Sequence, residues 1–398
     1  MPPKRAGSPV GDTENRPSVK RSKSSTTSDT TSTYPWINKG IPESVSFPPA
    51  GDNIRISAWN RGMSDVSIRK KGFSKYIAAE DADILVLTET KVSDKPADPL
   101  LSKKYPHQYW SMAGKKGYAG TAVLSKHKPL STSFTLDCDS SLKPALDKED
   151  VKGRLVTLEF ENCWVIGTYV PNAGDGLKNM DRKVAWQVAF EAHLRKLDAI
   201  KPVIWTGDLN VAPTAKDLRN DKSNWNKTAG YTQQETSAFA RILAGPKDLP
   251  TPKIEVAAVI QECAATPNKV ETHTATAVTD GVTVSINDTK DTETVTENGS
   301  LVESVTVTAV VTTETTTSTL HAGPGPMIDT WRKLHPKDEH YSYFSYRFGA
   351  RQKGMGWRID HFVLSERLFP RVASCEIRNE IWGASDHCPI VMDIEGPL

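Results

Sequence analysis

Short apolar runs alternate with polar, turn-forming segments along most of the chain. Eight of these runs have the length and β-branched content of strands: Ile54–Trp59, Ile84–Thr88, Gly120–Ser125, Leu155–Phe160, Cys163–Tyr169, Val203–Thr206, Arg358–Leu364 and Ile390–Ile394. Three longer segments carry a helical pattern: Arg69–Glu80, Met180–Leu197 and Glu235–Leu243. The residues Phe160 to Cys163 read as a hairpin turn, which predicts some antiparallel pairing. Together the runs predict an α/β fold with layered sheets.

Two segments depart from this pattern. Residues 1–33 are rich in Ser, Thr, Pro and Lys and nearly lack large apolar side chains, so we expect them to be disordered. Residues 251–325 are acidic, Thr-rich and free of aromatic residues, which favours a flexible insertion. Alternation in Gly281–Ile286 and Val302–Val311 leaves open that these two stretches pair as a hairpin. We therefore predict a single folded domain built from residues 34–250 and 326–398.

The net charge of +2 is unevenly distributed along the 398 residues. Residues 1–33 carry six Lys/Arg and three Asp/Glu, a net +3, whereas residues 251–325 carry three Lys and ten Asp/Glu, a net −7. Subtracting both from +2 leaves +6 on the remaining chain. A moderately basic folded part suits a polyanionic partner.

The basic tail contains two clusters separated by a polar spacer, Lys4-Arg5 and Lys20–Lys23. This is the bipartite pattern of nuclear import signals, so we expect a nuclear protein. A mitochondrial presequence is the alternative, although Asp12 and Glu14 interrupt the positive charge. No apolar run approaches the roughly 18 residues that a membrane span needs, and we expect no membrane partner.

The five cysteines are scattered and none has C-x-x-C spacing. This argues against a zinc module and against a disulfide framework, and it fits a reducing compartment.

Six of the apolar runs have polar side chains at or near one end, where α/β proteins assemble their sites. They are Asn60, Glu89, Lys91, Tyr169, Asn172, Asp208, Asn210, Asp360, Asp386 and His387. Any one of them is explained by a cap or a turn, but six strand ends together favour a site.

The residue types at these strand ends fit one chemistry. Carboxylate and amide oxygens are hard ligands that suit Mg²⁺ or Mn²⁺. A His beside Asp can polarise a hydroxyl or a water, and amide and phenol groups can donate to an oxyanion. The chain has no Gly-rich phosphate loop and no Ser or Cys nucleophile motif. The pattern therefore favours metal-assisted hydrolysis of a phosphate ester over acyl transfer or nucleotide-dependent transfer.

Seven ordered motifs carry a resemblance to a known family: "SAWNRG", "LVLTETK", "GYAGTAVLSK", "TYVPNAGDGL", "WTGDLNVAP", "GWRIDHFVLS" and "GASDHCPI". They resemble the exonuclease III family of abasic-site DNA endonucleases, in the endonuclease/exonuclease/phosphatase superfamily. The resemblance covers Ile54 to Ile394 apart from residues 251–325. It implies a four-layer α/β sandwich, two packed mixed sheets flanked by helices, with the site at one edge of the sheets.

The activity that this resemblance implies is metal-dependent hydrolysis of duplex DNA 5′ to abasic sites, in base excision repair. The implied cofactor is Mg²⁺ or Mn²⁺, and the implied partner is duplex DNA with abasic sites or damaged 3′ ends, bound by a monomer. Two alternatives stay open. One is an enzyme that mainly processes 3′ ends as an exonuclease or phosphodiesterase. The other is a non-catalytic DNA-binding member, against which the intact polar set argues.

The resemblance also assigns roles to individual residues. By motif, Asp208 handles the proton and Asn210 steadies the phosphate. His387 contacts the phosphate while Asp360 fixes its tautomer. The catalytic set is Tyr169, Asp208, Asn210, Asp360 and His387. The metal set is Asn60, Glu89, Asp208, Asn210, Asp386 and His387. The DNA-binding set is Asn172, Asn224, Asn226, Tyr343 and Trp357.

Three features depart from the family pattern. Gly62 stands where relatives usually carry Asp or Asn, which could weaken a metal position. Asp175 stands where some relatives place a basic residue that enters the DNA. The 251–325 insertion is absent from compact members.

Overall fold

The computed structural model describes residues 43–63, 72–136, 144–246, 324–381 and 383–398, together with the backbone of four short strands between residues 276 and 305. The disorder expected for residues 1–33 and the two basic clusters lie outside the described residues.

Two six-stranded sheets form the centre of the protein. The first has the order β15 (Val372–Ile377), β16 (Ile390–Glu395), β1 (Asn53–Asn60), β2 (Ile84–Thr88), β4 (Thr121–Ser125) and β3 (His107–Ser111). The second has the order β13 (Met327–Asp329), β14 (Asp360–Ser365), β8 (Val203–Asp208), β7 (Trp164–Tyr169), β6 (Leu155–Glu159) and β5 (Ser131–Ser133). Only the neighbours β1–β2 and β7–β8 within these two sheets are parallel. Both sheets are therefore mixed.

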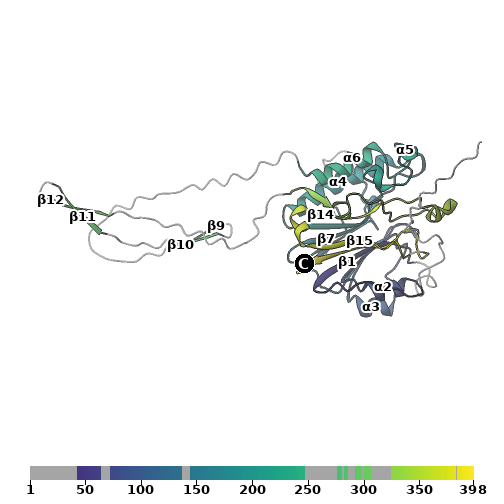
Figure 1. Ribbon diagram of the computed structural model, residues 1–398, viewed down its shortest axis with the longest axis horizontal. Coiled ribbons are helices and arrows are strands. Elements are labelled where there is room, and N and C mark those ends of the chain that lie inside the picture. The colour runs from purple at the N-terminus through teal and green to yellow at the C-terminus, as the bar shows by residue number, and fades with distance from the viewer. Residues whose placement is uncertain are drawn as a thin grey trace, which may run out of the picture. The chain divides into compact units, whose positions relative to one another are not determined.

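Helices cover the outer face of each sheet (Figure 1). Helices α2 (Ser74–Glu80) and α3 (Pro99–Lys104) pack on the first sheet, and α4 (Met180–Asp198) and α6 (Gln233–Ala244) pack on the second. The remaining helices within the described residues are short: α5 (Asp221–Asn224), α7 (Thr330–Leu334), η2 (Lys148–Asp150), η3 (Asp175–Leu177), η4 (Ala215–Asp217), η5 (Arg347–Gly349), η6 (Arg351–Lys353) and η7 (Glu366–Arg371). This confirms the predicted four-layer sandwich.

Each central strand supplies two cores because successive side chains point to opposite faces. In β8, Ile204 belongs to the core between the sheets, whereas Trp205 packs with the aromatic residues of α4 and α6. The sheets approach closely at Gly167, where an added Cβ would lie 2.8 Å from a Val86 methyl carbon and 2.9 Å from one of Val123. A larger residue there would force the two sheets apart.

The eight predicted strands are all present within two residues of their predicted bounds. The predicted hairpin turn is also confirmed, since the Phe160 amide donates to the Cys163 carbonyl at 2.9 Å. Helices α4 and α6 match their predictions, whereas α2 begins at Ser74, and residues 69–71 lie outside the described part of the chain. The pattern missed β3, β5, β13, β15, α3, α5 and α7. These elements are short or lie at sheet edges, where the periodic signal is weak.

The four short strands of the insertion form two separate hairpins. Strand β9 (Thr276–Thr279) pairs with β10 (Val282–Ser285), and β11 (Thr292–Glu297) pairs with β12 (Ser300–Val305). The hypothesis that Gly281–Ile286 pairs with Val302–Val311 is therefore wrong. Each strand instead pairs with its neighbour across Asp-Gly or Asn-Gly, the dipeptides that favour two-residue turns, because a short loop costs less entropy to close.

Among the described residues, no helix has both the length and the apolar character that crossing a membrane requires.

Candidate active site

The candidate side chains converge because both parallel strand pairs end at the same edge of the sandwich. Asn60 is the last residue of β1 and Glu89 follows β2, its parallel neighbour. Tyr169 and Asp208 are the last residues of β7 and β8, and they are directly paired. The carboxyl ends of parallel strands are the usual place for a site in such sheets.

Two antiparallel strands bring their amino ends to this edge. Asp360 begins β14 and pairs with Asp208 of β8. His387 precedes β16, and its carbonyl accepts a hydrogen bond from the Trp59 indole at 3.0 Å. Ser385 donates to the Asn60 carbonyl at 2.6 Å, which ties the segment before β16 to the end of β1. The two halves of the site, distant in sequence, are thus fixed against each other.

Asp208 lies at the centre of the cluster and is 2% exposed. Its Oδ2 accepts from the Asn60 amide group at 2.7 Å, and its Oδ1 accepts from the Asn210 backbone N–H at 2.9 Å. Burial, reinforced by the negative charge of Asp360, raises the pKa of Asp208 to about 7. The carboxyl group is therefore fixed in orientation and can exchange a proton near neutral pH.

Asn210 occupies a strained turn next to Asp208. Its φ of 51° lies in the left-handed region, which costs a non-glycine residue free energy and is common at functional sites. The Asn210 Nδ2 donates to the Val170 carbonyl at 2.8 Å, and its Oδ1 accepts from Asn172 Nδ2 at 2.8 Å. Hydrogen bonds to Val170 and Asn172 therefore fix the conformation of this turn.

His387 and Asp360 form a buried pair. The His387 Nδ1–H donates to Asp360 Oδ2 at 2.8 Å, and Ser342 Oγ donates to the same oxygen at 2.7 Å. Burial would lower the pKa of His387, but the Asp360 carboxylate outweighs it and raises the pKa to about 10. Because Nδ1 donates to Asp360, Nε2 is the ring nitrogen that can contact a bound ligand.

Glu89 is held beside the cluster by Lys91, whose Nζ lies 2.6 Å from Glu89 Oε2. The Asn60 amide, bonded to Asp208, also lies 3.4 Å from Glu89 Oε1. Burial would raise the pKa of Glu89, but Lys91 holds it below its ordinary value. Glu89 is therefore an ionised carboxylate close to the Asp208 carboxyl group.

The carboxylates gathered here are the donors that a hard divalent cation prefers. Ligand atoms of Asp208, Asp360 and His387 lie within 4.8 Å of one another, and the Asn60 amide joins Asp208 to Glu89. Asp360, predicted only to orient His387, thus also belongs to this cluster. Carboxylate and amide oxygens favour Mg²⁺ or Mn²⁺ over softer metals. A cation would also offset the repulsion between these crowded carboxylates.

The cluster forms the floor of a cleft of about 1020 Å³. Of the predicted DNA-binding residues, Asn172, Asn224, Tyr343 and Trp357 line this cleft. Asn226 is not among its lining residues, and its side chain accepts from the Gln233 amide at the start of α6, at 2.7 Å. The structure therefore gives Asn226 a capping contact.

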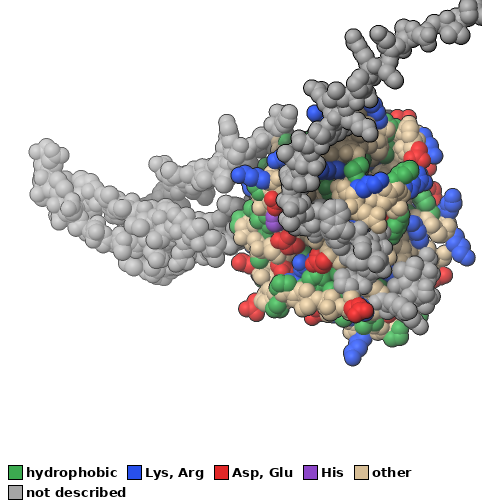
Figure 2. Space-filling model, turned by 45° about the vertical axis from the view of Figure 1, so that its right-hand side comes forward, with side chains coloured by type: hydrophobic (Ala, Val, Ile, Leu, Met, Phe, Trp, Pro, Cys, Tyr) green, Lys and Arg blue, Asp and Glu red, His purple; other side chains and the backbone are tan. Residues whose placement is uncertain are grey.

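Several cleft residues escaped sequence reasoning. Lys178 and Lys227 line the cleft, as do Tyr346 and Phe348, which are 58% and 87% exposed. An aromatic residue before a glycine, as in "RFG", was a signal, but sequence does not reveal exposure. On the face of the protein that Figure 2 shows, acidic and basic side chains are interspersed.

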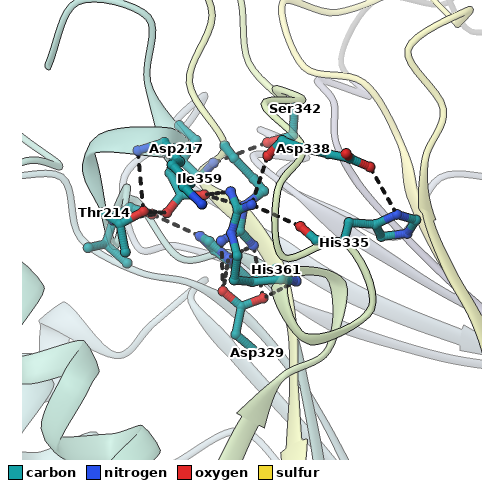
Figure 3. A network of polar contacts seen from close by, with 12 residues as sticks. Thr214, Asp217, Asp329, His335, Asp338, Ser342, Ile359 and His361 are labelled. Carbon is teal, nitrogen blue, oxygen red and sulfur yellow. Dashed lines mark hydrogen bonds and ion pairs between the residues drawn. The ribbon is translucent and has the colours of Figure 1, made fainter.

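A buried ionic network anchors the strand that carries Asp360 (Figure 3). Arg358 Nε donates to Asp217 at 2.8 Å, and its two terminal nitrogens donate to Asp329 at 2.9 and 2.7 Å. Arg358 also donates to His361 Nδ1, while His361 Nε2–H donates to the Val211 carbonyl at 2.8 Å. The network thereby joins β13, β14 and the loop after β8.

The two single-residue departures lie close to the site. A Cβ added to Gly62 would meet only the Glu89 carbonyl oxygen within 4 Å, at 3.9 Å, so a larger residue fits. Asp175 is exposed and lines the cleft.

The fold and the buried carboxylate, amide and imidazole cluster define a hydrolase that acts on phosphate esters. Residues 57–387 match the Endonuclease/Exonuclease/phosphatase family, and the chain belongs to it. An exodeoxyribonuclease of Bacillus subtilis (strain 168) is 32% identical over 342 residues, covering 86% of this chain and 99% of the relative. The DNA repair nuclease APEX1 of Danio rerio is 31% identical over 344 residues, covering 85% and 82%. These relatives confirm the exonuclease III resemblance and identify a hydrolytic nuclease.

Solved structures agree on the fold. An AP endonuclease from Archaeoglobus fulgidus has a TM-score of 0.56 at 22% identity and covers 86% of this chain and 100% of its own. A 3′-5′ exonuclease from Neisseria meningitidis has a TM-score of 0.55 at 17% identity, with the same coverage.

Proposed function

We propose that this nuclease is a divalent-metal-dependent DNA-repair endonuclease that hydrolyses the phosphodiester 5′ to abasic sites in duplex DNA. The observation that carries the proposal is the buried Asp208, oriented by Asn60 and Asn210 beside the His387–Asp360 pair. Relatives named as a DNA repair nuclease and an apurinic or apyrimidinic site endonuclease support this substrate.

Asp208 is the proton-transfer group in this proposal. Its pKa of about 7 lets it take a proton from the attacking water, or give one to the leaving 3′ oxygen, at neutral pH. Asn60 and the Asn210 amide each hold one carboxyl oxygen and so fix its direction.

The phosphate is held by groups that donate protons in hydrogen bonds. His387 is protonated, because Asp360 raises its pKa against the effect of burial, and its Nε2–H can donate to a non-bridging oxygen. Desolvation raises the pKa of Tyr169 well above its ordinary value, so this phenol stays protonated and can donate too. Both groups would stabilise the charge that develops on the phosphate.

The cation is Mg²⁺ or Mn²⁺ in this proposal. Glu89 would hold it, with Asn60 and Asp208 beside it. When bound, such an ion supplies charge neutralisation at the phosphate. Chelation by EDTA should abolish cleavage, and Mg²⁺ or Mn²⁺ should restore it. Full activity in the chelator would contradict the metal-dependent mechanism.

The cleft offers surfaces for a DNA strand with a missing base. Tyr343 and Trp357 would wall the pocket for the base-free sugar, and the exposed Tyr346 and Phe348 can stack on neighbouring bases. The backbone phosphates of the DNA would form ion pairs with three lysines of the cleft, Lys91, Lys178 and Lys227.

A second candidate function is 3′-end processing, because one relative is named an exodeoxyribonuclease. Two duplexes separate the candidates, one with an internal abasic site and one with a recessed, blocked 3′ end. We expect faster cleavage of the first in Mg²⁺, with Asp208→Asn as the inactive control. Faster processing of the second duplex would assign the protein to 3′-end repair instead.

We further propose nuclear localisation, on the strength of the two basic clusters in residues 1–23, and a monomeric state as in the family resemblance. A fluorescent fusion with Lys20 to Lys23 replaced by alanine or serine should lose nuclear accumulation. Unchanged nuclear localisation would contradict the import role, and sedimentation of the full chain would test the monomer.

A further inference from the structure

A fully buried ion pair lies behind the catalytic turn, between the two helices that cover the second sheet. Lys183 of α4 and Glu235 of α6 are both 0% exposed, and their Nζ and Oε1 atoms lie 2.5 Å apart. Neither residue lines the cleft or belongs to the motifs that define the site. Their contacts nevertheless lead to the site from two directions.

Lys183 holds the strained turn beside Asp208. Its Nζ donates to the backbone carbonyl of Asn210 at 2.7 Å, on the residue with φ of 51°. The N–H of Asn210 in turn donates to Asp208 Oδ1. A single ammonium group therefore fixes the carbonyl of Asn210, the residue whose own N–H orients the proton-transfer carboxyl group.

Glu235 holds the loop on the other side of this turn. Both of its carboxylate oxygens accept from the Gly230 N–H at 2.9 Å, and Oε2 also accepts from Thr232 Oγ1 at 2.8 Å. Gly230 has φ of 94°, and its carbonyl accepts from Ala212 at 2.8 Å. Residues 227–230 line the cleft, so Glu235 fixes a stretch of its wall.

Stability alone is a weak explanation for such a pair. Removing two charges from water is costly, and replacing a buried ion pair with apolar residues of similar volume is often neutral or stabilising. The pair joins helices that already pack through Trp186, Phe190 and Phe239. What apolar side chains would not supply is the donor to Asn210 and the acceptor for Gly230.

We propose that Lys183 and Glu235 are positioning residues for the nuclease reaction. Lys183 sets the Asn210 turn and thereby the direction of the Asp208 carboxyl group. Glu235 sets the cleft wall that meets the DNA. This inference rests on the proposed function and adds two residues to its machinery.

The test is the double variant Lys183→Met/Glu235→Leu, which removes both charges and leaves neither buried alone. We expect the variant to fold with a lowered melting temperature, because the apolar pair can fill the same space but leaves the Asn210 carbonyl and the Gly230 N–H without these partners. We also expect kcat on the abasic duplex to fall about tenfold, because the Asn210 carbonyl has lost its anchor. A kcat above one third of wild type in the folded double variant would overturn the proposal.

A matched control is Arg55→Met/Asp393→Leu. This ion pair is also largely buried, with side-chain exposures of 4% and 12%, and it lies near the opposite end of β1 from Asn60. Its loss should change the melting temperature without lowering kcat below one third of wild type. An equal fall in kcat in both double variants would mean that general loosening is the cause, and would overturn the positioning role.

A second variant decides the question if the double variant does not fold. Glu235→Gln preserves shape, and its amide oxygen can still accept from Lys183, but its amide NH₂ group cannot accept from Gly230 or Thr232. The lysine loses its counter-charge, so the melting temperature should fall as well. We expect KM for the abasic duplex to rise more than threefold while kcat stays within threefold. An unchanged KM would overturn the role of Glu235.

Amide hydrogen exchange separates this proposal from the proposed activity. In the double variant, or in Glu235→Gln if the former does not fold, amides between residues 208 and 230 should exchange at least tenfold faster than in wild type. The Arg55/Asp393 control should leave them unchanged. If wild type fails to cleave the abasic duplex, the proposed function fails, whereas exchange still reports on the positioning role. Unchanged exchange rates would overturn it.

Discussion

At the scale of single residues, the properties of the site come from neighbours rather than from residue type. Asp81 is 65% exposed and bridges two lysines, whereas Asp208 is buried beside Asp360 with its pKa raised to about 7. The same side chain is thus a solvated anion in one place and, in another, a buried group that can exchange a proton near neutral pH. Burial weakens solvation of the charge, and the adjacent carboxylate opposes it further.

Asp208→Asn is expected to lower turnover by about 10²–10⁴-fold while leaving DNA binding intact. Asparagine keeps the size and hydrogen-bonding capacity of the side chain, but it cannot carry the proton. Single-turnover cleavage at saturating DNA measures the loss of turnover. Fluorescence anisotropy measures whether DNA binding is kept. Turnover above a tenth of wild type would show that Asp208 does not have this role.

Gly62→Asp is expected to lower the Mg²⁺ concentration that gives half-maximal activity. The position is open, with one backbone oxygen at 3.9 Å from an added Cβ, and it lies close to Glu89. An added carboxylate would strengthen the attraction for a cation. Glu89→Ala is the opposite change and should raise the required concentration. Magnesium titrations of both variants that overlay wild type would contradict this account of the metal site.

At the scale of elements, the site depends on anchors that hold strand ends and loops in place. The Arg358 network joins β13, β14 and the loop after β8, and Ser342 adds a hydroxyl that fixes Asp360. These contacts explain why an arginine precedes Asp360 in "GWRID". Strand ends need such contacts because their backbone is no longer held by two neighbouring strands.

Asp217→Asn tests this anchoring. Asp217 is fully buried and accepts from Arg358 at 2.8 Å and Arg332 at 2.6 Å. Its loss should lower the free energy of unfolding at pH 7 by about 3–5 kcal/mol, because Arg358 is left partly unpaired. Urea unfolding measures this. Asp81→Asn is the exposed control and should cost less than about 1 kcal/mol. Equal losses in the two variants would contradict the anchoring role.

The same variant has a defined pH dependence. Burial would raise the pKa of Asp217, but Arg358 and Arg332 hold it well below its ordinary value. Because the pKa of Asp217 is lower in the folded protein than in the unfolded chain, its ionised form stabilises the fold. This stabilisation is present in full at pH values above the ordinary pKa range of a carboxyl group. This stabilisation is lost as the pH falls through the depressed value. The stability difference between wild type and Asp217→Asn should therefore be constant near neutrality and shrink only in strong acid.

At the scale of the whole molecule, the domain is one sandwich interrupted by a long excursion between α6 and β13. The two ends of this excursion meet, since a Cβ added to Gly245 would lie 2.9 Å from the Pro326 nitrogen. Arg195 of α4 donates to the Gly325 carbonyl at 2.8 Å and to the Ile242 carbonyl at 2.5 Å, so one side chain ties both ends. The motifs that carry the candidate site lie on either side of this junction.

Deletion of residues 252–324, with a short Gly/Ser linker, is expected to leave the cleavage rate within a few-fold of wild type. The ends already meet, and closing a loop costs only about 0.6 kcal/mol per doubling of its length. The segment is also acidic, so it would be repelled by DNA. Cleavage kinetics and thermal melting check the result. A melting temperature several degrees lower would show that the insertion packs on the domain.

The sequence by itself determined the features that local chemistry encodes. Continuous apolar runs defined β2 and β8, because a strand that is buried on both faces carries apolar side chains at successive positions. The ordered motifs around Asp208 and His387 indicated the family, and they carry side chains that lie together in the structure. The three-residue strands β5 and β13 were missed because they are too short to carry a period.

Only the tertiary structure decided which groups meet and which are buried. It paired Lys183 with Glu235, 52 residues apart, and placed both behind the Asn210 turn. It exposed Phe348 at the cleft and gave Asn226 a capping contact outside the cleft lining. The physical reason is that exposure, pKa and hydrogen-bond partners depend on segments distant in sequence, whereas a motif reports only its own neighbours.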